Sequence, residues 1–87
     1  MLIHLIQLLE DDSYEFSENY IQIDAYANIY QIESITIDEE NEDRCYVYMV
    51  SGDFFHVDES MDDLCKRYEA ILYGSHLTKF YKIDKLN

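Results

Sequence analysis

One stretch, RCYVYMVSGDFFHVDES, constrains the fold of this chain more than any other. Two segments with the composition of β-strands, Arg44–Val50 and Asp53–Asp58, are separated only by Ser51-Gly52. A two-residue connection of this kind is typical of a tight antiparallel hairpin. The sequence therefore predicts a β-hairpin at the centre of the fold, and the other elements have to be placed around it.

A two-residue turn also predicts which residues face each other. It would place Val50 opposite Asp53 and Met49 opposite Phe54. The predicted faces are Cys45, Val47, Met49, Phe54 and His56 on one side, and Tyr46, Tyr48, Val50, Phe55 and Val57 on the other. Both faces are apolar, so we expect one to pack on a helix and the other to be covered or open for a partner.

A helix is predicted directly after the hairpin, over Met61–Tyr73. Ser60 is a suitable N-cap, and Asp63 stands three residues later, as in a capping box. An apolar stripe at helical spacing follows: Met61, Leu64, Cys65, Tyr68, Ile71 and Leu72. We expect Gly74 to end this helix. The short basic segment after it, 75–87, is expected to form a further strand or to dock loosely.

The N-terminal half is harder to interpret. Apolar residues at helical spacing predict a short helix from about Leu2 to Asp11, with a strand as the competing interpretation. Alternation with a period of two then predicts strands near Tyr20–Asp24 and Tyr30–Asp38, connected by Ala25–Asn28. Together these elements predict an α+β fold with a three- to four-stranded antiparallel sheet, a helix packed on one face, and a short N-terminal helix. We expect residues 1–87 to form a single small acidic domain.

Charge is distributed unevenly along the chain. The formal net charge is -13, but residues 1–65 hold 17 acidic residues and one base, Arg44, whereas residues 66–87 carry a net charge of +3. Phosphate repulsion would oppose direct binding of DNA or RNA by the acidic part. A basic protein partner would be attracted to it. Solubility is the alternative reason for so much charge.

The cysteines and the N-terminus indicate where such a chain would be found. Cys45 and Cys65 are the only cysteines, too few for the disulfide framework of a small secreted protein, although one bridge between them stays open. The apolar run Leu2–Leu9 lacks a basic flank and is too short to cross a bilayer. We expect a cytoplasmic protein without a membrane partner, in the host cytoplasm if the gene belongs to a phage.

We find no motif for catalysis or for a cofactor. A nucleophile–base pair of Cys65 with His56 is conceivable, but both residues fit a structural role better. For a metal, the residues His4, His56, His76, Cys45 and Cys65 do not have zinc-ligand spacing. The alternating acids Asp38, Glu40 and Glu42 resemble the start of an EF-hand, but the glycine and the terminal glutamate of that motif are absent. The sequence therefore predicts a binding protein, with no catalytic residues, metal or cofactor.

One segment, Ile21–Leu72, resembles the small FlbD-type modules found near flagellar genes and in phage genomes. The resemblance rests on IDAYANIYQIES, on YVYMVSGDFFHVDES and on the amphipathic helix that follows. It implies a compact β-β-β-α unit with a regulatory or structural role, and it carries over no catalytic residue. The acidic loop Asp38–Asp43, the apolar N-terminus and the basic tail depart from that pattern.

In overall style, the acidic and tyrosine-rich composition resembles small phage-encoded inhibitors such as anti-CRISPR proteins and other DNA mimics. Immunity proteins against nuclease toxins have the same style. The expected contact surface joins two acidic runs and two rings: Asp38, Glu39, Glu40, Glu42, Asp43, Tyr46, Tyr48, Glu10, Asp11 and Asp12. Carboxylates spaced roughly like phosphates, next to rigid aromatic area, suit a basic protein surface.

The leading hypothesis is thus an acidic inhibitor that occupies the basic nucleic-acid-binding surface of a nuclease or CRISPR effector. Two alternatives remain open. One is a FlbD-like regulatory or structural module that forms a homodimer through an open sheet face. The other is an immunity protein that neutralises a basic nuclease toxin.

Overall fold

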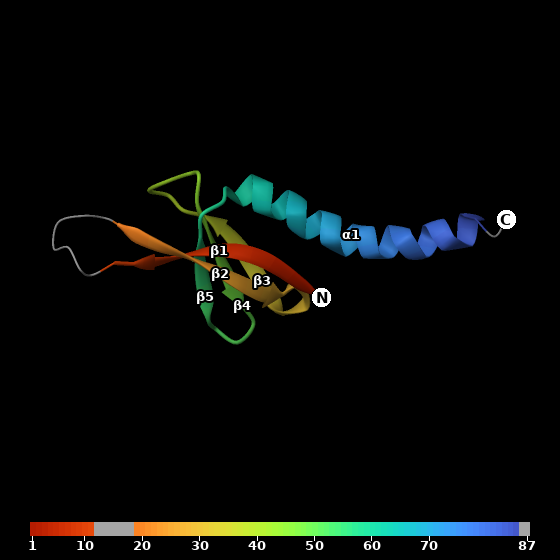
Figure 1. The fold of residues 1–87 in the computed structure, drawn as a ribbon, viewed down its shortest axis with the longest axis horizontal. Helices are drawn as coiled ribbons and strands as arrows, with labels where there is room; N and C mark the ends of the chain where they lie inside the picture. Colours follow the sequence, from red (N-terminus) through yellow and green to blue (C-terminus); the bar gives the residue numbers. More distant parts are fainter. Residues whose placement is uncertain (12–18, 86–87) are drawn as a thin grey trace.

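The computed structural model describes residues 1–11 and 19–85, with side chains described as far as Gly74. These residues form a five-stranded antiparallel sheet and one long helix (Figure 1). The elements are β1 (Leu2–Glu10), β2 (Tyr20–Asn28), a 3-10 turn η1 (Ile29–Gln31), β3 (Ile32–Ile37), β4 (Cys45–Met49), β5 (Phe54–Val57) and α1 (Met61–Lys85). The α+β class is confirmed, but the sheet has one strand more than predicted.

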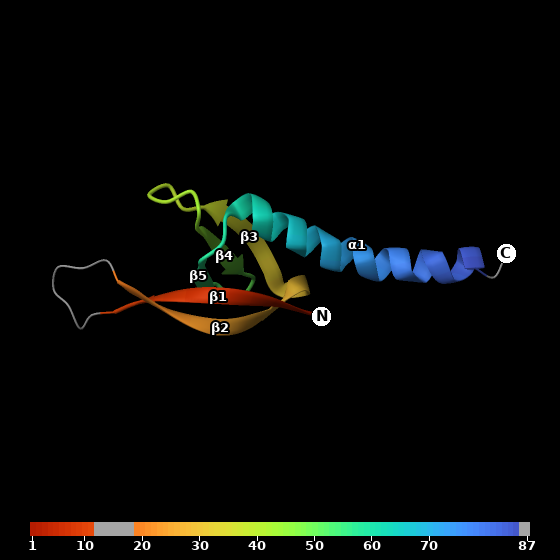
Figure 2. The ribbon, with the colours of Figure 1, turned by 45° about the horizontal axis from the view of Figure 1, so that its top comes forward.

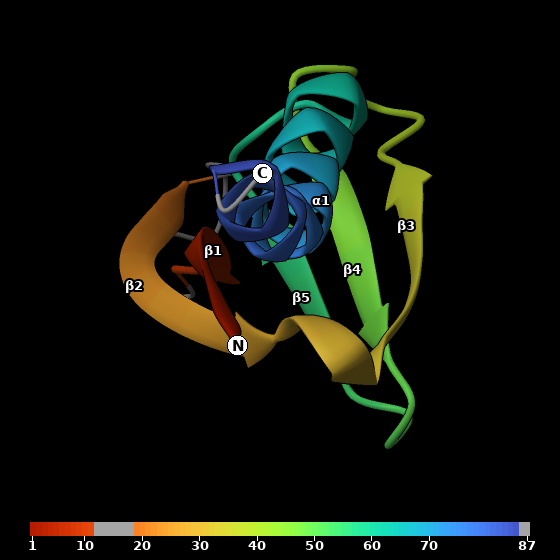
Figure 3. The same ribbon diagram turned by 90° about the vertical axis from the view of Figure 1, so that its right-hand side faces the viewer.

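The sheet has the strand order β2-β1-β5-β4-β3. It joins a β1–β2 hairpin to a β3-β4-β5 meander, and the two halves meet where Gln7 of β1 faces Val57 of β5. The N–H of Asp58 extends this contact by donating to the carbonyl of Ile6 at 2.9 Å. Figure 3 shows that the sheet curves around α1, which lies on its inner face.

The predicted N-terminal helix is wrong, because Leu2–Glu10 is the strand β1. It pairs with β2 along its whole length, from Leu2 opposite Asn28 to Glu10 opposite Tyr20. The apolar run is dense enough to fit either period, and the long-range pairing with β2 decided between them. The same pairing makes Ala25–Asn28 part of β2, so the predicted connection there is also wrong.

The strand predicted over Tyr30–Asp38 is confirmed with shorter bounds, as β3. The actual connection is η1, whose first turn is stabilised when the side chain of Asn28 accepts the N–H of Tyr30 at 3.0 Å. Through η1 the chain passes from β2, at one edge of the sheet, to β3, at the other.

The β4–β5 hairpin is confirmed, but its predicted register is wrong by one residue. Its loop contains three residues, because Met49 rather than Val50 donates to Asp53 O, at 2.8 Å. Gly52 closes this loop with φ +95, a left-handed conformation suited to the last position of a three-residue loop. Tyr48 is consequently opposite Phe54, and Val47 is opposite Phe55.

This one-residue shift exchanges the faces of β5. Phe55 and Val57 lie with the inner residues of β4, while Phe54 and His56 lie with Tyr46 and Tyr48 on the outer face. The buried core lies between the inner face and α1 and consists of Ile3, Leu5, Ala27, Cys45, Val47, Val57 and Leu64. The sheet therefore has one core face and one outer face rich in rings.

The helix starts as predicted but does not end as predicted. The hydroxyl of Ser60 accepts the N–H of Asp63 at 3.2 Å, which confirms the N-cap. The helix then continues through Gly74 to Lys85, so the predicted stop and the predicted strand or loose tail after it are wrong. Gly74 does not have a positive φ, and a helix tolerates such a glycine at a cost of about 1 kcal/mol. Figures 1 and 2 show this end of α1 extending beyond the sheet.

One side chain of α1 links it to two other parts of the chain. The guanidinium of Arg67 donates to both carboxylate oxygens of Glu59, at 2.9 and 2.6 Å, and to the carbonyl of His4 at 2.7 Å. The hydrogen bonds to Glu59, opposed in part by burial, raise the pKa of Arg67 above its usual value. This clamp holds α1 against β1 and the segment that leads into the helix.

Candidate protein-interaction face

Five rings form a continuous aromatic cluster on the outer face: Tyr20, Tyr46, Tyr48, Phe54 and His56. His56 is central, because its ring stacks on Tyr46 with centroids 4.6 Å apart and planes at 11°, and meets Tyr20 edge-on at 5.3 Å. The guanidinium of Arg44 lies over the ring of Tyr20, 4.8 Å from its centroid. These contacts fix the ring positions before any partner arrives.

Asp38 connects the aromatic cluster to the acidic loop, residues 38–44. The Nε2–H of His56 donates to Oδ2 of Asp38 at 2.8 Å, and both side chains are nearly buried. The other carboxylate oxygen of Asp38 accepts the N–H of Glu40 at 3.0 Å. Burial opposes the charge of Asp38, yet the hydrogen bonds from His56 and Glu40 together hold the pKa of its carboxyl below the usual value. Asp38 thus positions the loop and presents little charge to a partner.

The rest of the acidic loop is also shaped by its own hydrogen bonds. The N–H of Asn41 donates to the carbonyl of Asp38 at 3.2 Å, and the Asn41 side chain accepts the N–H of Asp43 at 3.0 Å. Arg44 closes the loop with an N–H bond to the carbonyl of Asn41 at 3.0 Å. The loop is therefore a pair of tight turns with a backbone shaped by its own hydrogen bonds.

The acidic loop and the tyrosines enclose a surface hollow of about 450 Å³. We call it the acid–tyrosine hollow, and its lining is Thr36, Ile37, Asp38, Glu39, Glu40, Tyr46 and Tyr48. Burial and the nearby charge of Asp38 raise the pKa of Tyr46, which keeps its hydroxyl neutral. Negative charge and neutral ring faces therefore meet in one depression.

The structure brings five of the predicted contact residues to this hollow and places the others elsewhere. Glu42 lines a smaller pocket of about 170 Å³ with Ser60 and Met61 near the start of α1. Asp43 is exposed in the acidic loop. Glu10 faces Tyr20 across the β1–β2 hairpin, and Asp11 bonds through its N–H to Asn19 O at 2.9 Å. Asp12 lies outside the described residues.

Glu10 and Asp11, the described part of the second acidic run, lie at the same end of the molecule as the acidic loop. Figures 1 and 2 both show the acidic loop and the C-terminal end of β1 opposite the C-terminal end of α1. Glu10 shares the outer face with Tyr20, because directly opposed residues point to the same side of a sheet. Tyr20 in turn touches His56, so the aromatic cluster lies between the two runs.

Sequence reasoning missed three members of this face: Tyr20, Phe54 and His56. His56 and Phe54 were assigned to the opposite face from the tyrosines by the two-residue turn. A three-residue loop ending in Gly52 was the signal that would have found them. Tyr20 gives no local signal, because only the pairing of β1 with β5 brings β2 near the cluster.

The two cysteines and the described histidines, His4 and His56, do not converge on a reactive site. Cys45 is a buried free thiol, and burial, with smaller effects of Glu59 and Cys65, raises its pKa to about 12. Cys65 is also free, and its pKa is raised by burial and by Glu69 and Asp62. Cys65 lies on α1 beside the inner face, whereas His56 lies on the outer face, so the sheet separates the conceivable Cys65–His56 pair. Among the side chains that the structure describes, in residues 1–11 and 19–74, no group of three or more His, Cys, Asp or Glu has the geometry of a metal site.

Comparison with known proteins finds no matching family model, no matching curated protein and no matching solved structure. The described part of α1 contains no apolar stretch long enough to cross a membrane.

Proposed function

We propose that this chain is an acidic protein–protein interaction module, a phage-type inhibitor that occupies the basic nucleic-acid-binding surface of a host nuclease or CRISPR effector. The acid–tyrosine hollow is the observation that supports this proposal. Carboxylates of the acidic loop and two rings of β4 line one depression of about 450 Å³. A lysine or arginine side chain of a partner would meet both negative charge and ring faces there.

Two physical features make this hollow suited to a protein partner. Tyr48 is exposed while Tyr46 is braced by His56, so one ring is free for contact and the other is held rigid. Rigid aromatic area costs little conformational entropy when it is buried by a partner. The acidic loop is already ordered by its own hydrogen bonds, which lowers the cost of binding further.

The charge of the chain then selects the partner. A net charge of -13 repels nucleic acid and attracts basic surfaces, over distances that salt shortens. A surface that normally binds phosphates is the most basic kind of surface that such a molecule would meet in a cell. Occupancy of that surface by the module would exclude the nucleic acid.

The experiment is a competition assay. A nucleic-acid-binding protein retained from the host on immobilised chain at low salt is purified, and its binding to duplex DNA is measured with and without the chain. The proposal expects mutual exclusion and an affinity that falls steeply with salt. Formation of a ternary complex of partner, DNA and chain would contradict it.

Matched variants locate the surface in the same assay. Glu39→Gln with Glu40→Gln removes two charges from the acid–tyrosine hollow, and Asp24→Asn with Asp53→Asn removes two elsewhere. We expect the first pair to weaken binding by about tenfold or more and the second by about twofold. Equal losses would show that only net charge matters and that the hollow is not the contact surface.

Two other functions would use the same face. An immunity protein would present the same contacts to a basic nuclease toxin, and the identity of the retained partner distinguishes this case. A FlbD-like regulatory module would instead form a homodimer through the outer face, where Tyr48 and Phe54 are exposed. Sedimentation that shows a stable dimer, lost on Tyr48→Ala, would favour that alternative.

A further inference from the structure

The strand β3 lies at the edge of the described sheet, with β4 on one side and no strand on the other. We propose that the basic partner binds as an extended segment that adds a strand to this open edge, with alternating apolar and basic side chains. The inference rests on the proposed function and specifies the form that the partner takes. It comes from three features of β3: the direction of its backbone groups, and a hollow on each of its two faces.

The phase of the β3–β4 ladder shows which backbone groups are open. The N–H of Asp38 donates to the carbonyl of Arg44 at 3.2 Å, so this pair lies in the ladder. Backbone groups of successive residues in an antiparallel strand alternate between its two neighbours. The N–H and C=O groups of Ile35 and Ile37 therefore point away from β4, toward the open edge. An extended segment can pair with them as a strand.

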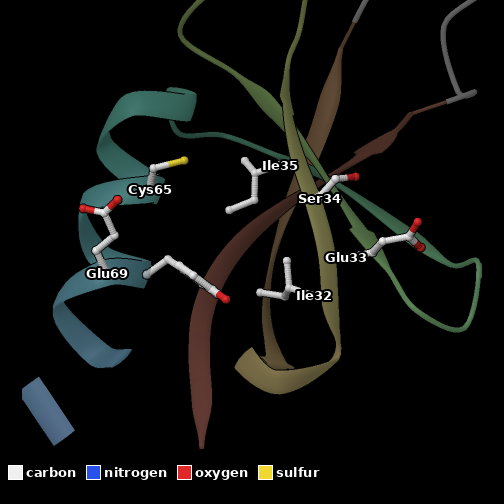
Figure 4. Close-up of a pocket in the computed structure, with 7 residues that line it drawn as sticks. Ile32, Glu33, Ser34, Ile35, Cys65 and Glu69 are labelled. Carbon is white, nitrogen blue, oxygen red and sulfur yellow. The ribbon is translucent and has the colours of Figure 1, made fainter. Parts of the chain in front are cut away.

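On the inner side of this edge lies a groove whose lining is mainly apolar. Figure 4 shows Ile32 and Ile35 of β3 pointing toward α1, with Cys65 facing them across the groove. The groove has a volume of about 270 Å³. Tyr68 and Glu69 complete its lining on α1, and Glu33 and Ser34 also line it on β3. A valine or leucine side chain of an added strand would enter it.

On the outer side of the same edge, the surface is acidic. Figure 4 shows Glu33 and Ser34 pointing away from α1, as expected where the register shifts between Ile32 and Ser34. Ser34 lies opposite Tyr48, and Thr36 lines the acid–tyrosine hollow. A basic side chain on this face of an added strand would reach the carboxylate of Glu33 or the hollow. Side chains of an added strand would point alternately to the two faces of the sheet. Every second side chain would therefore meet the mainly apolar groove, and those between would meet the acidic surface.

Charge indicates a basic partner and not a second copy of this chain. Two copies paired through β3 would each bring a net charge of -13 and place Glu33 and the acidic loop beside like charges. Natural edge strands are often protected by lysine, proline or a pronounced bulge. Of these features, the described edge of β3 has only the irregularity near Ser34. Electrostatic repulsion is therefore the main obstacle to pairing of β3 with a second copy of the chain. The same charge attracts a basic segment.

The test uses a synthetic peptide in which valine and lysine alternate, with both termini capped. The control peptide has the same composition, but all its valines precede all its lysines. Binding to the full chain is followed by NMR titration at low salt. We expect the alternating peptide to bind at least about tenfold more tightly and to protect the amide protons of Ile35 and Ile37 from exchange. N-methylation of alternate peptide residues, which removes the N–H groups along one peptide edge, should abolish this advantage.

A pair of variants of the protein tests the role of the β3 edge independently of the peptide. Ile37→Pro removes one outward N–H at a position where an edge strand tolerates proline, and Ile37→Val keeps that N–H. We expect the first to weaken binding of the alternating peptide by about tenfold and the second by less than about twofold. Thermal unfolding verifies that both variants are folded.

The remaining outcomes separate the two proposals. Equal binding of the alternating and control peptides, with shifts confined to the acidic loop, would overturn strand addition and leave the basic-partner function intact. Failure of both peptides to bind would overturn strand addition, while the competition assay with the retained partner decides the proposed function. Protection of Ile35 and Ile37 without peptide, together with a dimer in sedimentation, would assign the edge to a second copy and overturn this inference.

Discussion

Tyr48 lies directly opposite Phe54 across the β4–β5 hairpin, with the two ring centroids 5.8 Å apart. Both side chains are exposed, at 38% and 57% of their full area. An exposed aromatic pair contributes little to the core, so its effect on folding and its effect on binding can be separated by mutation.

Tyr48→Ala is expected to lower the affinity for a basic partner by about tenfold or more, because it removes an exposed ring from the acid–tyrosine hollow. The free energy of unfolding should fall by only about 1 kcal/mol, because 38% of the side chain is already exposed in the folded protein. Tyr46→Ala is the comparison, and it should cost about 2 kcal/mol or more because its ring stacks on His56. Urea unfolding and partner titration measure the two quantities. A larger loss of stability for Tyr48→Ala than for Tyr46→Ala would contradict the finding that Tyr48 is the more exposed of the two rings.

Asp38→Asn is expected to destabilise the protein by about 2 kcal/mol at pH 7, the typical contribution of a hydrogen bond to a charged group. The folded-state pKa of Asp38 is depressed, so its ionised form stabilises the fold above the unfolded pKa of about 4. This contribution is lost as the pH falls through the folded pKa, and the gap between wild type and variant should close there. Urea unfolding at pH 7 and in acid measures it. Asp43→Asn, in the exposed part of the loop, serves as the control, and a gap that is independent of pH would refute the assignment.

The two glycines should respond in opposite directions to the same substitution. Gly52→Ala is expected to cost about 1 kcal/mol, because φ +95 is unfavourable for any residue with a Cβ. Gly74→Ala should stabilise by about 0.5–1 kcal/mol, because Gly74 is inside a helix and a Cβ there would have no heavy atom within 4 Å. Thermal unfolding of both variants measures this. The idea that α1 continues past Gly74 would be wrong if Gly74→Ala were as destabilising as Gly52→Ala.

Arg67→Lys is expected to destabilise by about 1 kcal/mol although it keeps the charge. Lysine cannot donate to both oxygens of Glu59 and to the carbonyl of His4 in the geometry of the guanidinium fork. Lys66→Arg, at the neighbouring position, should change stability by less than about 0.5 kcal/mol. A double-mutant cycle with Glu59→Gln gives the coupling energy, and a coupling near zero would show that the ion pair does not hold α1 in place.

The sequence predicted the elements best where local chemistry decides them. Ser60 begins the helix by its own hydroxyl, and the β4–β5 hairpin is evident from its composition and its glycine. The identity of β1 could not be predicted, because its apolar run fits two periods and only pairing with β2 selects one. The hairpin register also could not be fixed, because Ser51-Gly52 can serve as a complete turn or as the last two residues of a three-residue loop.

The candidate site shows the same division. The acidic loop and the tyrosines of β4 are adjacent in the sequence, so their meeting in one hollow could be anticipated. Tyr20 reaches the aromatic cluster only through the strand order β2-β1-β5, which no local pattern encodes. His56 reaches it through the register of the β4–β5 hairpin, which depends on the length of the loop. The hydrogen bond between Asp38 and His56 could not be predicted either, because the two-residue turn places His56 on the opposite face from the tyrosines.

The open edge of β3 also has a consequence for handling the protein. Its described edge residues include three isoleucines and no lysine or proline, so colloidal stability depends on the ionisation of the whole molecule and little on local sequence. As carboxylates protonate in acid, that repulsion disappears while the strand remains exposed. Acidification or very high salt should therefore convert a well-dispersed preparation into one that self-associates through backbone pairing, and storage near neutral pH at modest ionic strength should prevent this.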